Sequence, residues 1–279
     1  MQIHRPLNYI QDVDDPRDFK FDKRLFKNKT KNQRSKILGR LPKKIDHEQN
    51  MTPVKDQGQL GSCVGFSCVA VKEWQEWQEY LRIKDNIDLD KNPFNDLSEQ
   101  WLYYNCKKID NIPNEGTTLR AAMKVLQKKG VPNEEAWEYN PNEKGSPESW
   151  AKKIAKFTRI NNYYKINNLT QLKLALLHTP VPIGVLVFKT FYKVRNNGLV
   201  ELPKRNQSEL GGHAICVVGY DDEMKVIKFK NSWGTRWGKR GYGYLPYKYF
   251  KKYCIMAWAF DDLFQTEENI EKIQNFSKK

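Results

Sequence analysis

The chain has 279 residues, of which 39% are hydrophobic, so it is long and apolar enough to bury the core of one or two domains. Its 48 lysines and arginines outnumber its 33 aspartates and glutamates, which gives a formal charge of +15. The basic residues are spread along the whole chain without a nucleic-acid-binding motif, so we expect a charged surface with, at most, nonspecific attraction to polyanions. No run of about 18 apolar residues occurs, which argues against a membrane span.

Residues 1–40 form an N-terminal extension with uneven charge. Its first part is acidic, with Asp12, Asp14 and Asp15, whereas residues 20–44 carry eleven basic side chains against one acidic one. Such a charge block is typical of a flexible, solvated arm. A sharper hypothesis is that the extension crosses a cleft of the folded protein and limits access to it until it is displaced or cut.

The first half of the chain is predicted to be mainly helical. From Cys63 to Leu81, apolar residues recur at helical spacing, and residues 117–129 form a second amphipathic pattern that ends at Gly130. After Ala175 the pattern changes to short β-rich runs at residues 181–188, 213–220, 225–230 and 241–246, separated by turn residues. The sequence therefore predicts an α+β fold with a helical part followed by an antiparallel sheet or barrel. The polar tail from about residue 266 to 279 is expected to fray.

The five cysteines are Cys63, Cys68, Cys106, Cys216 and Cys254, and their spacing indicates neither paired loops nor a metal site. Unpaired cysteines behave as small buried hydrophobic residues. Together with the lack of an apolar secretory core near the N-terminus, this favours a reducing, intracellular compartment, either cytoplasmic or inside a particle.

Three separate motifs carry the chemistry of a nucleophilic site. Gln57 precedes Cys63 by six residues, and Cys63 is placed at the start of a helix; His213 and Asn231 follow in the β-rich half. A helix N-terminus and an imidazolium neighbour lower a thiol pKa, so Cys63 is predicted to rest as a thiolate paired with His213. Asn231 would orient the imidazole ring, while Gln57 and the Cys63 backbone N–H would stabilise an oxyanion.

These motifs resemble those of the papain-like (cathepsin-type) cysteine peptidases. The resemblance runs from about Leu41 to Phe260 and rests on Leu41-Pro42, Val54-Lys55-Asp56-Gln57-Gly58, Leu97-Ser98-Glu99-Gln100 and Lys230-Asn231-Ser232-Trp233-Gly234-Thr235-Arg236-Trp237-Gly238. It implies a two-lobed fold, with a helical lobe at about 55–165, an antiparallel barrel-like lobe at about 166–260, and the active site in the cleft between them. The peptidase domain would span 41–265. A long inhibitory propeptide and a secretory signal are usual in this family, and we expect neither from this sequence.

Carried over by position, the resemblance implies that Cys63 is the nucleophile, His213 the base, Asn231 the orienting group and Gln57 the oxyanion donor. It also implies a set of substrate-binding residues: Gly116, whose backbone would pair with an extended peptide; Gly211 and Ala214, beside a roomy apolar specificity pocket; and Trp233 and Trp237, which line the cleft. Trp233 would also shield the bond between Asn231 and His213. No metal and no cofactor is implied.

Three positions depart from the family pattern. Leu60 replaces a cysteine that is usually disulfide-bonded, Val64 replaces an aromatic residue, and Gly212 replaces an acidic or amide residue before His213. None of these changes removes a catalytic atom, but the last is expected to shift the pH optimum.

The favoured function is hydrolysis of peptide bonds in a peptide or protein substrate through an acyl-thioester intermediate, with endopeptidase preferred over exopeptidase. The alternative is a weakly active homologue that binds peptides in the cleft or polyanions on a basic face. Residues 1–40 are the candidate autoinhibitor, and the sequence leaves the oligomeric state open.

Overall fold

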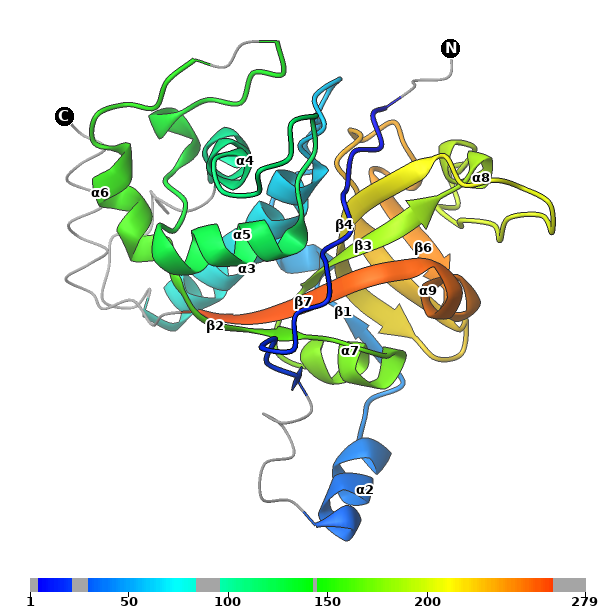
Figure 1. Cartoon of the computed structure of the whole chain (residues 1–279). Helices are drawn as coiled ribbons and strands as arrows, with labels where there is room; N and C mark the ends of the chain where they lie inside the picture. The colour runs from blue at the N-terminus through cyan, green and yellow to red at the C-terminus, as the bar shows by residue number, and fades with distance from the viewer. Residues whose placement is uncertain (1–4, 22–29, 84–95, 143–144, 263–279) are drawn as a thin grey trace.

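The computed structural model describes residues 5–21, 30–83, 96–142 and 145–262. The helices between residues 63 and 155 gather on one side of the molecule, and a large sheet lies on the other with shorter helices of the second half around it (Figure 1). The predicted α+β class is therefore confirmed, whereas the predicted C-terminal tail lies outside the described residues. Among the described residues, no helix combines the length and apolar character needed to cross a bilayer.

The helical side is organised around α3 (Cys63–Ile83), as its apolar spacing predicted. Two shorter helices pack against it, and each begins at a capping hydroxyl. Ser98 Oγ accepts the Trp101 N–H at the start of α4 (Glu99–Lys107), and Thr118 Oγ1 accepts the Ala121 N–H at the start of α5 (Leu119–Lys128). Gly130 follows α5 with a φ of +73°, in the left-handed region that glycine adopts most readily.

The sheet is antiparallel, and its order is β2-β7-β3-β4-β5-β6, with β1 pairing β4 outside that path. It is not closed into a barrel. The strands are β1 (Lys44–Asp46), β2 (Ile160–Lys165), β3 (Val181–Val187), β4 (Gly211–Asp221), β5 (Val226–Lys230), β6 (Tyr242–Pro246) and β7 (Cys254–Asp262). The remaining helices are α2 (Lys31–Gly39), α6 (Ala151–Ala155), α7 (Leu169–Ala175), α8 (Lys189–Tyr192) and α9 (Tyr247–Tyr253), with 3₁₀ turns at Glu48–Asn50, Glu134–Ala136 and Lys156–Thr158.

Strand β4 is buried on both faces and separates two apolar clusters. Its residues alternate, so that Ala214 and Cys216 join the cluster beneath the helices, whereas Ile215 and Val217 join the cluster on the opposite face. Because α3 packs directly on β4, this strand carries side chains to the boundary between the helices and the sheet.

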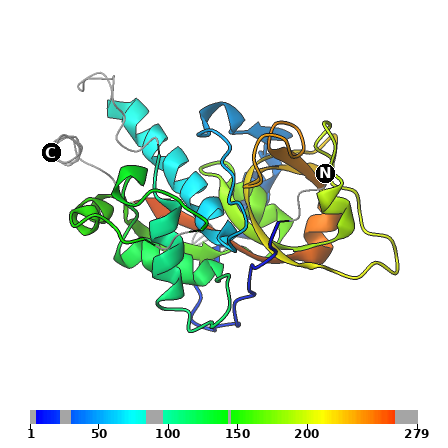
Figure 2. The same cartoon turned by 90° about the horizontal axis from the view of Figure 1, so that it is seen from above.

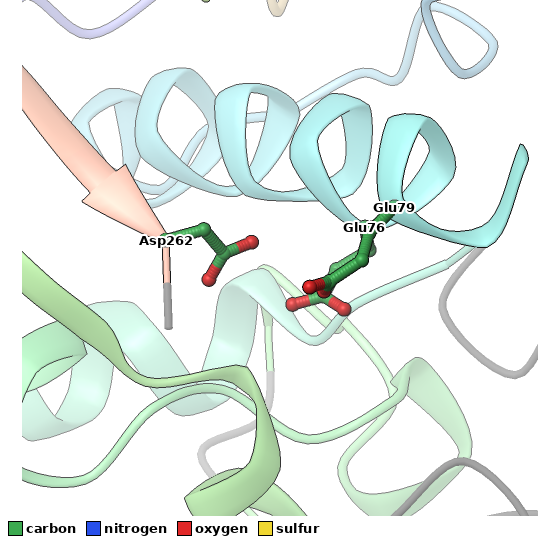
Figure 3. A group of neighbouring side chains, drawn as sticks. All are labelled: Glu76, Glu79 and Asp262. Carbon is green, nitrogen blue, oxygen red and sulfur yellow. The ribbon is translucent and has the colours of Figure 1, made fainter. Parts of the chain in front are cut away.

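A buried ionic cluster joins the far end of α3 to the end of β7. The Lys72 ammonium is fully buried and pairs with Glu76 and Asp262. Figure 3 shows the carboxylates of Glu76 and Glu79, from the helix, and of Asp262, from the strand, turned toward the same space. Because the Lys72 ammonium is buried, loss of its partners would leave an uncompensated charge, so this contact links the strand end to the helix.

The N-terminal segment, defined here as residues 5–21, runs between the helices and the sheet (Figures 1 and 2). It forms isolated bridges with both sides, pairing Asn8 with Gly212 of β4 and Tyr9 with Thr117 before α5. Helix α2, which comes later in the extension, has no buried residue and is capped by a reciprocal bond between Thr30 and Gln33.

Candidate active site

Cys63 is the first residue of α3, as predicted, so its thiol lies at the positive end of the helix. The loop before it is held from two directions. The Tyr139 hydroxyl donates to the Gln57 carbonyl at 2.7 Å and lies 2.6 Å from Ser62 Oγ, while the Gln57 N–H donates to the Ser232 carbonyl at 2.9 Å. These bonds fix the cysteine-bearing loop against the turn that follows β5.

The register of β4 and β5 brings His213 and Asn231 together. Cys216 of β4 pairs with Lys230, the last residue of β5. His213 comes shortly before Cys216 on β4, and Asn231 directly follows Lys230, so both lie at the same end of this strand pair. His213 Nε2 donates to Asn231 Oδ1 at 2.8 Å, which fixes the tautomer with the proton on Nε2. Both side chains are buried.

Trp233 covers this pair, as its position in the motif predicted. Its ring lies against His213 with centroids 4.7 Å apart and an interplanar angle of 34°. Phe191 approaches the imidazole edge-on at 6.0 Å. The aromatic cover excludes water and strengthens the bond between His213 and Asn231.

Cys63 meets β4 at the residue that follows the histidine. The Cys63 thiol is hydrogen-bonded by the backbone of Ala214. His213 Nδ1 is buried and has no hydrogen-bond partner within the described residues. One imidazole nitrogen is thus committed to Asn231, and the other makes no hydrogen bond in the part of the chain that the structure describes.

Burial sets the protonation state of both groups. Loss of solvent raises the pKa of the Cys63 thiol to about 11 and lowers the pKa of the His213 imidazole to about 4. Both shifts disfavour the charged forms, so they run against the resting thiolate–imidazolium pair that the sequence predicted. That pair stays a prediction.

Gln57, the predicted oxyanion donor, is also fully buried. Its Nε2 donates to the Leu60 carbonyl at 2.9 Å, and its Oε1 accepts the Ser232 hydroxyl at 2.7 Å. Ser232 thereby orients the amide so that its NH₂ group faces the loop that leads to Cys63.

The N-terminal segment lies against residues on both sides of this site. Tyr9 N–H donates to the Gly212 carbonyl at 3.0 Å, and Ile10 N–H donates to the Thr117 carbonyl at 3.2 Å. A Cβ on Gly116 would lie 1.8 Å from the Asn8 carbonyl oxygen, so only glycine allows the segment to approach so closely. Gly211, another predicted substrate-binding residue, contacts Leu7.

Polar contacts hold the segment at both ends. At one end Arg5 forms an ion pair with Asp56, and the Arg5 carbonyl accepts the Tyr192 hydroxyl at 2.6 Å. At the other end Arg120 of α5 donates to Asp18 and, at 2.6 Å, to the Val13 carbonyl.

The acidic residues of the segment also form contacts at this second end. Both carboxylate oxygens of Asp12 accept the Arg120 N–H at 3.2 Å, and Asp14 accepts from Lys165 at 2.6 Å. Two of the acidic residues noted in the sequence, Asp12 and Asp14, therefore serve as anchors.

Trp237 lies away from the contacts of the segment. Its indole N–H donates to the Phe191 carbonyl at 3.1 Å, and its ring stacks on Phe191 at 5.3 Å. It supports the aromatic group that includes Trp233.

Several site residues were missed from sequence: Arg5, Tyr9, Arg120, Tyr139 and Phe191. The acidic residues in the first part of the extension were the one signal in the sequence that this segment binds elsewhere, but they did not show which residues it contacts.

Comparison with known proteins agrees with this geometry. Residues 41–260 match the family described as "Papain family cysteine protease". The chain is 32% identical over 269 residues to "Uncharacterized peptidase C1-like protein L477" of Acanthamoeba polyphaga mimivirus, covering 88% of this chain and 83% of that protein. It is 30% identical over 225 residues to cathepsin K of Gallus gallus, covering 78% of this chain but 62% of the relative.

Among solved structures, xylellain, a cysteine protease from Xylella fastidiosa, superposes with a TM-score of 0.74 at 29% identity, covering 92% of this chain and 96% of that one. The chain belongs to the papain family of cysteine proteases. It is accordingly a thiol peptidase, a hydrolase, and the family resemblance found in its motifs is confirmed.

Proposed function

We propose that this protein is an endopeptidase in which Cys63, His213, Asn231 and Gln57 perform the reaction, and that the N-terminal segment keeps it inactive until it is displaced. In the open enzyme His213 Nδ1 takes the Cys63 thiol proton, the sulfur attacks the substrate carbonyl carbon, and the resulting imidazolium gives that proton to the amine as the C–N bond breaks. Water then attacks the thioester carbonyl, His213 takes its proton, and that proton returns to the sulfur as the C–S bond breaks.

The oxyanion that forms during attack needs donors that are already oriented. The Gln57 amide is held by Ser232, and the Cys63 backbone N–H lies at a helix N-terminus, where no intrahelical partner satisfies it. Because one proton of the Gln57 NH₂ group is engaged by the Leu60 carbonyl, its second proton and the Cys63 N–H would be the donors to the oxyanion.

An internal cleavage site is supported by the path of the N-terminal segment. The segment enters past Asp56, passes Gly116 and Gly212, and leaves past Arg120, so polypeptide continues beyond the site in both directions. A site that binds an uninterrupted extended chain suits an endopeptidase better than an exopeptidase, which must recognise a chain end. The single observation that carries the proposal is this occupation of the site by a continuous strand.

The same observation supports autoinhibition. Main-chain bonds to Gly212 and Thr117 are the kind by which an added strand binds an edge, and a substrate would compete for them. With the segment bound, Cys63 and His213 are both fully buried, so a substrate carbonyl has no access to the sulfur.

Two measurements on the full chain test the proposal. A thiol-directed epoxide should label Cys63 stoichiometrically in the Arg120→Ala variant and much more slowly in the unaltered chain. Hydrolysis of an internally quenched peptide should follow the same order and fall by several orders of magnitude in Cys63→Ala/Arg120→Ala. A papain-like binding protein without activity would give neither the adduct nor turnover, and equal labelling of both chains would remove the inhibitory role.

A further inference from the structure

Residues 110–116 lie between α4 and α5, and three backbone carbonyls of this segment, here called the 110–116 loop, meet at one side chain. The Lys107 ammonium donates to the carbonyl oxygens of Ile112 at 2.7 Å, Asn114 at 2.9 Å and Gly116 at 2.9 Å. A lysine ammonium has three N–H donors, so these carbonyls engage all of them. The loop is therefore gathered around a single cation that belongs to the protein.

The cation is placed and balanced by its surroundings. Lys107 is the last residue of α4, where the helix dipole favours a positive charge. Both carboxylate oxygens of Asp110 lie 3.4 Å from its Nζ, and one of them accepts the Ile112 N–H at 2.9 Å. The Asp110 side chain is 1% exposed and that of Lys107 is 20% exposed, so water competes little for these bonds. Hydrogen bonds with one charged partner are stronger than neutral ones.

The loop has no other strong restraint of its own sequence. It contains no cysteine that could form a disulfide, and Asn111 has a φ of +54°, in the left-handed region that residues with a side chain adopt at some cost. The Gly116 N–H donates to the Tyr103 hydroxyl at 3.2 Å, and the Gly116 carbonyl accepts from Lys107, so both polar groups of this glycine are held from α4.

The position of Gly116 decides where the next carbonyl lies. The Gly116 carbonyl and the Thr117 N–H belong to one rigid peptide plane, so the bond to Lys107 sets the start of Thr117. The Thr117 carbonyl accepts the Ile10 N–H of the N-terminal segment at 3.2 Å. This is the kind of main-chain bond by which an extended chain is held in a groove.

We propose that Lys107 is a positioning residue for substrate binding, because its ammonium fixes the 110–116 loop and thereby the Thr117 carbonyl that receives an N–H of the extended peptide. The proposal rests on the proposed function, since it takes a substrate and the N-terminal segment to use the same carbonyl. Lys107 acts through the loop and not on a reacting atom. Its loss should therefore weaken binding and leave the chemical step almost unchanged.

Kinetics test the proposal in the Arg120→Ala background, so that the segment does not limit the rate. Lys107→Met removes the charge, and the KM of an internally quenched peptide should rise by about 5- to 100-fold while kcat stays within about threefold. The matched control is Lys108→Met, which removes the adjacent, exposed lysine whose Nζ lies 4.3 Å from the centre of the Tyr104 ring. It should change neither constant. An unchanged KM for Lys107→Met, or a fall in kcat at constant KM, would overturn the inference.

Chemical rescue separates the loss of the ammonium from general damage to the fold. In Lys107→Ala/Arg120→Ala, propylammonium supplies the missing atoms, and the partly exposed site gives it access. At neutral pH it should lower KM by at least about threefold, whereas uncharged propanol should not. Arg120→Ala alone shows the effect of the amine on an intact site. Equal effects of propylammonium and propanol, or no effect of either, would contradict the positioning role.

A third measurement needs no catalysis. Hydrogen exchange of the Gly116 amide should be at least about tenfold faster in Lys107→Met/Arg120→Ala than in Lys108→Met/Arg120→Ala, because the loop is no longer held. Equal exchange in the two variants would contradict only the role of Lys107. Absence of turnover in Arg120→Ala, combined with no epoxide adduct on Cys63, would contradict the proposed function instead.

Discussion

Arg120 of α5 holds Asp18 of the N-terminal segment through two hydrogen bonds, of 3.2 Å from Nε to Oδ1 and 2.5 Å from Nη2 to Oδ2. The same guanidinium donates to the Val13 carbonyl, and both side chains of the ion pair are largely shielded from water. A bidentate pair in such a position is stronger than an exposed one. Arg120 is therefore the main attachment on the α5 side of the cleft.

Replacement of Arg120 by alanine should raise the initial rate of the full chain toward a peptide substrate by about tenfold or more, because three hydrogen bonds of the bound segment are lost. The matched control is Arg17→Ala, which removes an exposed ion pair that lies wholly within the segment. Initial rates taken from progress curves recorded without preincubation distinguish the two variants. An unchanged rate for Arg120→Ala would mean that the segment is not held at this point.

Protonation of His213 should loosen the segment in a chain that lacks the thiol. Burial lowers the pKa of the His213 imidazole to about 4, and the share of that burial supplied by the segment is lost when the segment leaves, so the uncovered imidazole should have a higher pKa. The covered form therefore binds fewer protons, and covering should weaken as the pH falls from 7 to 5. If the segment supplied all of the burial, the weakening would be about 20-fold, which is its upper limit.

Hydrogen exchange of the backbone amides of the segment measures this effect. The control is Cys63→Ala/His213→Gln, which has no imidazole at position 213 to take up a proton. Asp12 and Asp14 remain in both chains and cancel in the comparison. If both chains lose protection equally between pH 7 and pH 5, the burial of His213 does not contribute.

Asn231→Ala should reduce kcat/KM by about 5- to 100-fold, measured in the Arg120→Ala background so that the segment does not limit the rate. The His213 Nε2 proton loses its acceptor at 2.8 Å, so the ring is no longer fixed with Nδ1 turned away from Asn231. The pH profile should change along with the rate, which a loss of packing alone would not cause. A kcat/KM within twofold of that of Arg120→Ala alone would show that the indole of Trp233 is sufficient to hold the His213 ring.

Gly130→Ala should destabilise the fold by about 2–5 kcal/mol, because φ is +73° and a Cβ would lie 1.7 Å from the Ala155 carbonyl oxygen. Gly39→Ala is the control, since a Cβ there meets no atom within 4 Å. Urea unfolding of the two variants gives the difference. Similar midpoints would contradict the steric argument.

The parts of the fold with a strong local pattern could be predicted from sequence. The start of α3 at Cys63, the end of α5 before Gly130 and the strands that carry His213 and lead to Asn231 follow from periodicity and turn residues. Local pattern did not reveal the path of the N-terminal segment, because its partners Gly116, Gly212 and Arg120 lie about a hundred or more positions away in the chain.

The protonation state of Cys63 could not be predicted for the same reason. Helix position and the histidine motif favour a thiolate, whereas burial raises the pKa of the thiol, and burial is a property of the assembled fold.

The segment and the site it fills belong to one polypeptide, and only residues 22–43 separate Phe21 from the first residue of β1. A tether of this length keeps the effective concentration of the segment at its site near the millimolar range, so diluting the protein does not release it. A single cut in the tether would turn this first-order rebinding into a second-order encounter. From then on, the fraction of open enzyme would depend on how far the two pieces are diluted.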